Sequence, residues 1–521
     1  MPLPGGSLRA ATDRSRCSRR PAQAPAPDNL PPLPGSGSRR RPAASVHSNR
    51  CLVRACVTEG HARLGCRVPA TDALGSALGE AMNAVSEPLS LQNLDITDTD
   101  LYVQQGYPWS AWDLLRDEAP VFWYQRPRHE PFWAITKHAD IGYISRNPDL
   151  FSNTQLLRLS DVETIRIGQR GRVRNANRYG GSPDDPPDFI FMDPPEHRHH
   201  RSAVTRHFTP RAMKRLEEHF AEMAENYVSR FANTVVEELA AKGKLGLVDV
   251  VHELSAKLPV AAICEMAGVP EEDWEQIFRW TESLVGAGDP EFRRPGETQE
   301  QTMRRNSGEW RRYNENLVTR RMKDGFGADI LSTLMQADIN GYQLSPREIS
   351  SYFTVLVAAG NETTRNSTTG GIKALLDNRD QLDRLIAEPE LVPSAVEEIL
   401  RWTSVVIQFQ RTATEDVELR GQTIRKGESV VMWYPSANRD EEVFDAPYTF
   451  DIGRDPNDHF AFGGYGEHFC LGAHLARWEM RAIFHALLPV LPTLELASEP
   501  ELVAGSLHVG GIKRMMVRAA G

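Results

Sequence analysis

The stretch Phe460-Ala-Phe-Gly-Gly-Tyr-Gly-Glu-His-Phe-Cys-Leu-Gly472 decides how the rest of this 521-residue chain is interpreted. Three glycines precede its single cysteine, Cys470, and one glycine follows it. A glycine-rich backbone can adopt positive φ and can approach a flat, bulky group closely. A helix-like pattern begins at Ala473, which places Cys470 near a helix N-terminus.

Free N–H groups and the helix dipole at such a position stabilise a thiolate. A thiolate suits the axial position of a haem iron. A buried structural thiol and a phosphate-binding glycine loop are the alternatives. The second fits poorly, because the glycines lack the spacing and the preceding strand of a dinucleotide-binding turn, and no Walker Lys-Ser/Thr pair accompanies them.

A long helix is the clearest regular element upstream of this loop. Ser345, Pro346 and Glu348 form a capping box with proline at the first helical position. The apolar pattern continues to about Leu376, and about 31 helical residues would span roughly 46 Å and cross the centre of a domain. Its middle, Ala359-Gly-Asn-Glu-Thr-Thr364, leaves room for a ligand beside an acid and a hydroxyl. Taken alone, this segment is better explained by a surface Glu and threonines that bond back to their own helix.

Elsewhere helix predominates and the predicted sheet is small. Amphipathic patterns predict helices over 210–240 and 254–266. Cys264 lies in the second of these and is predicted to be a core thiol. Short β-favouring runs stand at 132–136, 417–419, 429–433 and 515–517.

The overall composition is that of a globular protein. Apolar residues make up 40% and charged residues 25%, which excludes collagen, coiled coil and wholesale disorder. No run approaches the roughly 18 apolar residues of a membrane-spanning helix. The net charge of -10 argues against sequence-independent nucleic-acid binding. We therefore expect a cytoplasmic protein with no membrane span and no nucleic-acid partner.

Residues 1–81 differ from the remainder. They carry 12 Arg, no Lys and 5 Asp+Glu, a net charge of +7, against -17 for residues 82–521. Ten prolines and stretches rich in Arg, Ala and Gly cannot hold a packed apolar face, so we predict a disordered extension. This extension is either a tail or targeting segment, or translated sequence upstream of a true start at Met82.

Cysteine and histidine recur every five residues in that extension, at Cys51, Cys56, His61 and Cys66. Ligands at such spacings can hold zinc. Chance thiols in a flexible tail explain the same pattern, because no neighbouring apolar positions suggest a fold organised by zinc.

Taken together, three regions resemble the cytochrome P-450 haem-thiolate monooxygenases, and the resemblance covers 82–521. Ala359–Thr364 matches the oxygen-activation motif of that family, Glu398 and Arg401 match its Glu-x-x-Arg pair, and 462–472 matches its haem-binding loop. Residues 447–454 match its Pro-x-x-Phe-Asp-x-x-Arg stretch.

One detail departs from the commonest pattern. Phe462 stands eight residues before Cys470, where the usual phenylalanine stands seven before, so Gly463 occupies that place. The longer form resembles actinobacterial steroid and methyl-branched lipid hydroxylases, whose Ala-Gly-Asn-Glu-Thr-Thr-Arg-Asn segment is matched letter for letter by 359–366. The departure leaves Cys470 in place and bears only on the role of Phe462.

The resemblance implies a mainly α domain with a small β region, in which a long central helix lies over a thiolate-ligated haem b. The residues implied to bind this cofactor, with Cys470 as the metal ligand, are His197, Arg201, Ala359, Gly360, Arg411, Phe462, Gly463, His468, Cys470 and Gly472. The residues implied to form a buried structural network are Glu398, Arg401 and Arg454. The residues implied to line the substrate pocket are Leu356, Val405, Val406, Ile407, Leu507 and Val509.

The implied reaction inserts one oxygen atom of O₂ into a C–H bond of an apolar terpenoid, steroid or branched lipid. Glu362 is the expected proton relay to solvent, and Thr363 the hydroxyl that orients the activated oxygen. Because we find no flavin or nicotinamide domain, a separate ferredoxin or flavodoxin and its NAD(P)H-dependent reductase are expected to supply electrons to a monomer. Four arginines that flank the haem segments could form the docking face or be a solvated surface: Arg198, Arg206, Arg211 and Arg477.

Two other functions fit parts of the sequence. A haem-thiolate peroxygenase or isomerase would not need Glu362 and Thr363. A non-enzymatic binding protein would use the cysteines of the extension to hold zinc.

Overall fold

The computed structural model describes residues 88–159, 188–285, 291 and 293–520. These residues belong to one compact unit, Ser86–Gly521. The predicted extension and the hypothetical zinc ligands Cys51, Cys56, His61 and Cys66 lie outside the described residues.

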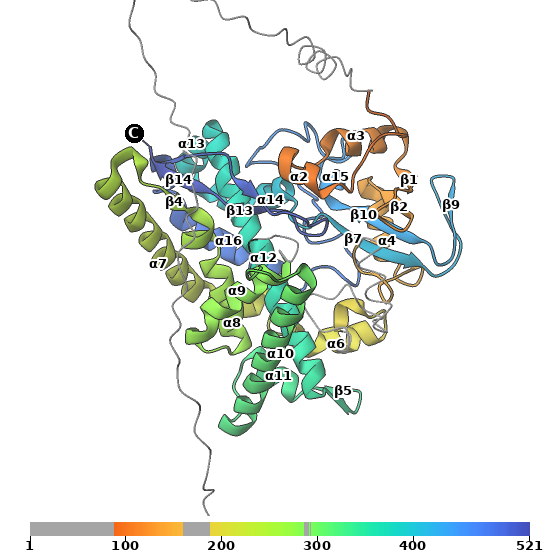
Figure 1. Cartoon of the computed structure of the whole chain (residues 1–521), viewed down its shortest axis with the longest axis horizontal. Coiled ribbons are helices and arrows are strands. Elements are labelled where there is room, and N and C mark those ends of the chain that lie inside the picture. Colours follow the sequence, from red (N-terminus) through yellow and green to blue (C-terminus); the bar gives the residue numbers. More distant parts are fainter. Residues whose placement is uncertain (1–87, 160–187, 286–290, 292, 521) are drawn as a thin grey trace, which may run out of the picture. The chain divides into compact units, whose positions relative to one another are not determined.

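Helices dominate this unit and sheets are few (Figure 1), which confirms the predicted mainly α fold with a small β region. The helices are α2 (Thr99–Gln105), α3 (Trp109–Glu118), α4 (His138–Arg146), α6 (Glu196–Thr205), α7 (Pro210–Lys242), α8 (Lys257–Ala267), α9 (Trp274–Val285), α10 (Gln299–Asp324), α11 (Ile330–Met335), α12 (Pro346–Asp377), α13 (Arg379–Ala387), α14 (Val392–Thr403), α15 (Tyr434–Ala437) and α16 (Ala473–Leu487). Among the described helices, none is both long enough and apolar enough to cross a bilayer.

Helix α12 is the predicted long helix, and it begins at the predicted capping box. The Ser345 side chain accepts a hydrogen bond from the Glu348 N–H, and the Glu348 carboxylate accepts one from the Ser345 N–H at 2.8 Å. The helix packs against α8, α9, α10, α14 and α16. Figure 1 shows it between the sheet that contains β2, β7 and β10 and the helices α7, α8 and α16. It therefore occupies the position expected of a central helix.

The main sheet has five strands in the order β1-β2-β10-β7-β3. Its pairs are antiparallel except for β2 and β10, which are parallel. The strands of this sheet are β1 (Val121–Tyr124), β2 (Phe132–Ile135), β3 (Phe151–Ser152), β7 (Gln408–Ala413) and β10 (Ser429–Trp433). The smaller sheets contain β4 (Val248–Asp249), β5 (Asp338–Ile339), β6 (Tyr342–Gln343), β8 (Val417–Leu419), β9 (Gln422–Ile424), β11 (Leu494–Leu496), β12 (Glu501–Leu502), β13 (Ile512–Arg514) and β14 (Met516–Ala519).

Strand β7 is one of the elements that sequence patterning did not predict. Its sequence, Gln-Phe-Gln-Arg-Thr-Ala, is mostly polar, yet all its residues except Phe409 are buried. The strand is buried because it pairs with β10 on one side and β3 on the other. Its placement matters for function, because it carries Arg411 and Phe409 to the wall of the cavity described below.

The second predicted helix, over 254–266, begins later than expected. A π-helical turn, Val251–Ser255, precedes α8, which starts at Lys257. Cys264 on α8 is fully buried and packs in a hydrophobic cluster with Phe278 and Leu356. Burial raises its pKa, so it is an unreactive core thiol, as predicted.

Candidate active site

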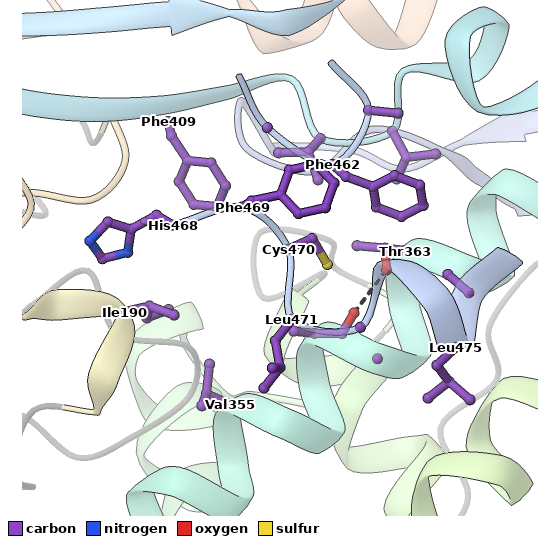
Figure 2. A pocket seen from close by; sticks show the side chains of 18 of the residues that line it. Ile190, Val355, Thr363, Phe409, Phe462, His468, Phe469, Cys470, Leu471 and Leu475 are labelled. Carbon is purple, nitrogen blue, oxygen red and sulfur yellow. Dashed lines mark hydrogen bonds between the residues drawn. The ribbon is translucent and has the colours of Figure 1, made fainter. Parts of the chain in front are cut away.

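A cavity lies between the middle of α12 and the loop 460–472. Figure 2 shows Cys470 with its Sγ directed into this space, with Thr363 and Phe462 among the surrounding side chains. The wall contains these predicted residues: Arg201, Leu356, Ala359, Gly360, Thr363, Val405, Val406, Arg411, Phe462, Gly463, His468, Cys470 and Gly472. The structure thus brings together residues from segments that are far apart in the sequence.

The loop that carries Cys470 depends on its glycines. The Cys470 N–H donates to the Phe462 carbonyl at 3.0 Å, which closes the loop on itself. Gly463 has φ +92 and Gly466 has φ +85, a region that favours glycine. A Cβ on Gly466 would lie 2.1 Å from the Ser145 carbonyl oxygen, so a side chain at that position would displace the loop from α4.

Cys470 lies just before α16, where Gly472 is the N-cap residue. The accessible surface of Cys470 is surface that it presents to the cavity, and the cavity lies deep in the protein. In the chain alone burial is the strongest influence and raises the pKa of Cys470, while the Gly472 N–H and the positive charges of Arg201 and Arg477 act in the opposite direction. The helix terminus favours the thiolate as expected, but it does not outweigh burial. A bound cation would complete the stabilisation of the thiolate.

Four side chains that can carry positive charge meet at one end of the cavity: His197, Arg201, Arg411 and His468. The rings of His197 and His468 have centroids 4.0 Å apart. Neither nitrogen of His197, nor Nε2 of His468, has a hydrogen-bond partner among the described residues. Arg201 donates to the Phe469 carbonyl at 2.7 Å, and Arg411 donates to the Gln410 carbonyl at 2.8 Å.

Burial lowers the pKa of all four groups, and that of His197 falls to about 4 because Arg201 adds repulsion. Buried donors without partners are costly unless a ligand satisfies them. The set therefore fits a group that brings negative charge into the cavity. Two carboxylates of a planar ligand meet that requirement, and the cavity face of Cys470 offers one metal ligand beside them.

Thr363 and Glu362 are neighbours on α12 with different surroundings. Thr363 lies on the cavity wall, and its hydroxyl donates to the Ala359 carbonyl at 2.8 Å (Figure 2). Glu362 is buried behind the wall and forms an ion pair with Arg365. Burial raises the pKa of Glu362, against the opposing effect of Arg365. The structure therefore separates the hydroxyl that can contact a ligand from the acid that can store a proton.

Three predicted pocket residues do not lie on the wall. Ile407 and Leu507 pack in the hydrophobic cluster that contains Trp433. Val509 forms an isolated β-bridge with Val406, so it supports the wall from behind. Sequence reasoning placed them in the pocket by resemblance, whereas packing against the sheet turns them away from it.

Several wall residues were not anticipated from the sequence. Phe409 and Tyr434 come from the sheet region, Phe189 and Ile190 from a 3₁₀ turn, and Ile263 from α8. The aromatic run Phe189–Phe191, just before the segment of His197 and Arg201, was a signal that could have indicated the 3₁₀ turn. For Phe409 the only signal was its position two residues before Arg411.

The predicted structural network is present below the loop. Arg401 makes a bidentate pair with Glu398, with both distances 2.7 Å, and Arg454 approaches the same carboxylate at 3.2 Å. Arg401 also donates to the carbonyls of Asn438 and Pro447 at 2.8 and 2.9 Å. These bonds tie α14 to the 438–454 segment, and they satisfy charges that would otherwise be costly to bury.

The four arginines proposed as a docking face differ in their pairing. Arg198 is exposed and forms an ion pair with Glu467. Arg477 is engaged by Glu397, with its Nε 2.8 Å from Oε1. Arg206 and Arg211 are exposed. The positive charge of Arg198 and Arg477 is thus partly neutralised within the chain.

Comparison with known proteins defines the class of this site. The chain matches the sequence model of the cytochrome P450 family over residues 169–491. The methyl-branched lipid omega-hydroxylase of Mycobacterium tuberculosis is 37% identical over 458 residues, which cover 85% of this chain and 99% of the relative. The steroid C26-monooxygenase of Rhodococcus jostii is also 37% identical, over 83% of this chain and 86% of the relative.

Solved structures agree with this match. The cytochrome P450 CYP268A2 of Mycobacterium marinum in complex with pseudoionone is 34% identical, with a TM-score of 0.70, and covers 84% of this chain and all of its own. CYP109E1 of Bacillus megaterium in complex with testosterone is 31% identical, with a TM-score of 0.65, over 81% of this chain and 100% of that one.

The chain therefore belongs to the cytochrome P450 family. It is a cytochrome P450 monooxygenase, whose family uses O₂, electron-donating partners and a haem-thiolate cofactor, and binds apolar substrates. The sequence-based identification of the family is confirmed.

Proposed function

We propose that this enzyme hydroxylates a C–H bond of a terpenoid, steroid or methyl-branched lipid, with electrons from a separate ferredoxin or flavodoxin and its NAD(P)H-dependent reductase. The observation that carries the proposal is the cavity itself: Cys470 opens onto a space whose wall also contains Thr363 and apolar residues such as Leu356 and Val405. Relatives named for methyl-branched lipids and steroids, and neighbours solved with pseudoionone and testosterone, support this substrate range.

The donor set fits haem b as the cofactor. Cys470 Sγ would be the iron ligand, and the unpartnered donors of His197 and His468, with Arg201 and Arg411, would hold the two propionates. When bound, the haem supplies an iron that binds and activates O₂. The chain supplies the surroundings: a thiol that opens onto the cavity, a group of cationic side chains and an apolar wall.

The side chains above the thiol have separate tasks. Leu356, Val405 and Phe409 exclude water and bind the apolar substrate. Because the Thr363 hydroxyl donates to its own helix at Ala359, its lone pairs remain available to accept a hydrogen bond from a proton carrier in the cavity. Glu362, which is buried and has a raised pKa, holds the proton that must be delivered there.

The carbon-monoxide difference spectrum of the reduced, haem-loaded protein tests the ligand. We expect the red-shifted Soret band of a thiolate ligand in the wild type and in Cys264→Ala, the core-thiol control, and its loss in Cys470→Ser. If haem-loaded wild-type protein lacks this band, Cys470 is not the ligand.

The reaction is tested with ¹⁸O₂, ferredoxin, reductase and NADPH, with a steroid, a methyl-branched lipid and a terpenoid offered separately. Mass spectrometry should find one ¹⁸O atom in a hydroxylated product of at least one of the three. Product formation with hydrogen peroxide alone, and none with O₂ and electrons, would instead identify a peroxygenase.

A further inference from the structure

A buried charge cluster behind the cavity wall joins α12 to α9. Arg365 on α12 donates from Nη1 to Glu282 on α9 at 2.9 Å, and from Nη2 to Glu362 on its own helix. The residues that precede the two acids are also joined: Asn361 on α12 donates a hydrogen bond to Thr281 on α9 at 2.6 Å. The two helices are therefore held in register at the point where both carboxyl groups meet one guanidinium.

The cluster contains more acid than base. Its side chains are 5% exposed for Arg365, 14% for Glu282 and 2% for Glu362. If both carboxyl groups were ionised, a net negative charge would lie inside the protein, where an uncompensated charge is costly. Two carboxyl groups that share one site resolve this by sharing a proton.

The hydrogen-bond pattern leaves a place for that proton. Oε1 of Glu362 and Nε of Arg365 have no hydrogen-bond partner among the described residues. Burial raises the pKa of Glu362 and of Glu282, while Arg365 opposes the rise in both. A protonated Glu362 that keeps Oε2 on Arg365 would carry its proton on Oε1.

Charged groups from other elements also act on Glu282. His252, exposed on the π-helical turn, packs edge-on against Phe278 with ring centroids 5.6 Å apart, and its charged form lowers the pKa of Glu282. Glu275, which lies nearer the N-terminus of α9, raises the pKa of Glu282. Glu362 is influenced by Arg365 and Glu282. Glu282 is thus the member of the pair that responds to groups near solvent.

We propose that Glu282 is a positioning residue for proton delivery, which holds Arg365 and shares one proton with Glu362 so that Glu362 stays protonated at neutral pH. The inference rests on the proposed role of Glu362 as the proton relay. Glu282 has the greater solvent contact, so protons enter the pair there. When Glu362 releases the shared proton towards the cavity, its carboxylate remains paired with Arg365 until a proton taken up from solvent at Glu282 replaces the one released.

The pH dependence of product formation by Glu282→Gln tests this role. Without a second acid, Glu362 faces Arg365 alone, so its pKa falls and it is protonated over a narrower range. The alkaline limb of the rate profile should move to lower pH by about one unit, the scale of coupling between neighbouring carboxyl groups. Glu282→Asp should restore the wild-type limb.

The matched control is Asp377→Asn, which removes an exposed carboxylate from α12, the helix of Glu362, where it lies 2.6 Å from Lys373 Nζ. This variant should keep the wild-type profile. Each variant must also keep the wild-type carbon-monoxide spectrum, so that a change in folding or haem binding is recognised. A wild-type profile in Glu282→Gln would overturn the inference.

Infrared difference spectroscopy of the holoenzyme gives a readout independent of turnover. In Glu282→Gln the C=O band of the protonated carboxyl should be lost at a pH about one unit lower than in the wild type, and in Glu362→Gln it should be absent at neutral pH, because the two acids hold one proton between them. Glu479→Gln should remove a different band, since Glu479 is buried, has a raised pKa and lies outside this pair. If Glu282→Gln leaves the band of Glu362 unchanged, the sharing does not occur. Failure of the proposed function would appear separately, as a wild-type protein that lacks the thiolate spectrum or makes no product.

Discussion

At the scale of single residues, the site divides its chemistry between Cys470, Thr363 and Glu362. Cys470 and Thr363 both open onto the cavity, whereas Glu362 lies behind the wall with a raised pKa. Buried acids with a raised pKa suit proton donation near neutral pH. The hydroxyl and the acid therefore act in sequence, and loss of either should separate electron consumption from product formation.

Thr363→Ala should bind haem and substrate normally but waste electrons. Without the hydroxyl, the proton carrier in the cavity loses its acceptor, and reduced oxygen escapes as hydrogen peroxide. We expect product per NADPH to fall by about tenfold, which is less than the factor of about 10²–10⁴ that a complete proton-transfer catalyst contributes, because Glu362 is still present. Product and peroxide measured together give the coupling, and Thr363→Ser should restore it. Tight coupling in Thr363→Ala would contradict the role.

At the scale of elements, α14 is anchored by charge as well as by apolar packing. Glu398 and Arg401 are fully buried, and Arg454 shares the same carboxylate with them. A buried ion pair adds little to the free energy of unfolding compared with apolar residues at the same positions. Loss of one partner, however, is costly, because it leaves a buried charge uncompensated. The network thus holds the 438–454 segment to α14 through hydrogen bonds and ion pairs within the chain.

Glu398→Gln should lower the free energy of unfolding by about 3–5 kcal/mol, because two buried guanidinium groups lose their anion. Asp377→Asn is the control, since it breaks an exposed pair with Lys373 on α12 and should cost about 0.5 kcal/mol or less. Urea unfolding of the haem-loaded proteins measures both values. If Glu398→Gln folds too poorly to be measured, the yield of haem-bound protein should still fall well below that of Asp377→Asn. Equal stability of the two variants would exclude an anchoring role.

At the scale of the whole molecule, we propose that the P450 domain occupies 82–521 and that 1–81 is a separate extension. The net charge supports this division, because it changes from +7 for residues 1–81 to -17 for residues 82–521. The methyl-branched lipid omega-hydroxylase supports it as well, because 99% of its length is matched by only 85% of this chain. Such a domain would contain every residue to which we assign a role in binding or catalysis.

A chain that begins at Met82 should therefore have the same carbon-monoxide spectrum, substrate affinity and unfolding midpoint as the full chain. Spectral titration with substrate and thermal unfolding of the two haem-loaded proteins make the comparison. A truncated protein that loses haem, or whose substrate affinity falls by tenfold or more, would show that the first 81 residues belong to the functional unit.

Local patterns in the sequence determined the elements on which the identification rests. The start of α12 followed from Ser345 and Glu348, because a capping box is formed by residues three apart and needs no distant partner. The loop around Cys470 followed from its glycines, because positive φ is a property of single residues. Fold class and family were predictable for the same reason: motifs in order along the chain carry them.

The tertiary structure decided what depends on distant partners. Strand β7 has a mostly polar sequence and is a strand because β10 and β3 pair with it. Ile407 and Leu507 do not line the cavity as predicted, because they pack in the hydrophobic cluster that contains Trp433. Glu282 is 83 residues from Arg365 in the chain, so no local pattern could link them. Sequence determined which residues carry the chemistry, and tertiary packing decided which acid, cation and wall surround each of them, because burial and charge are set by neighbours in space.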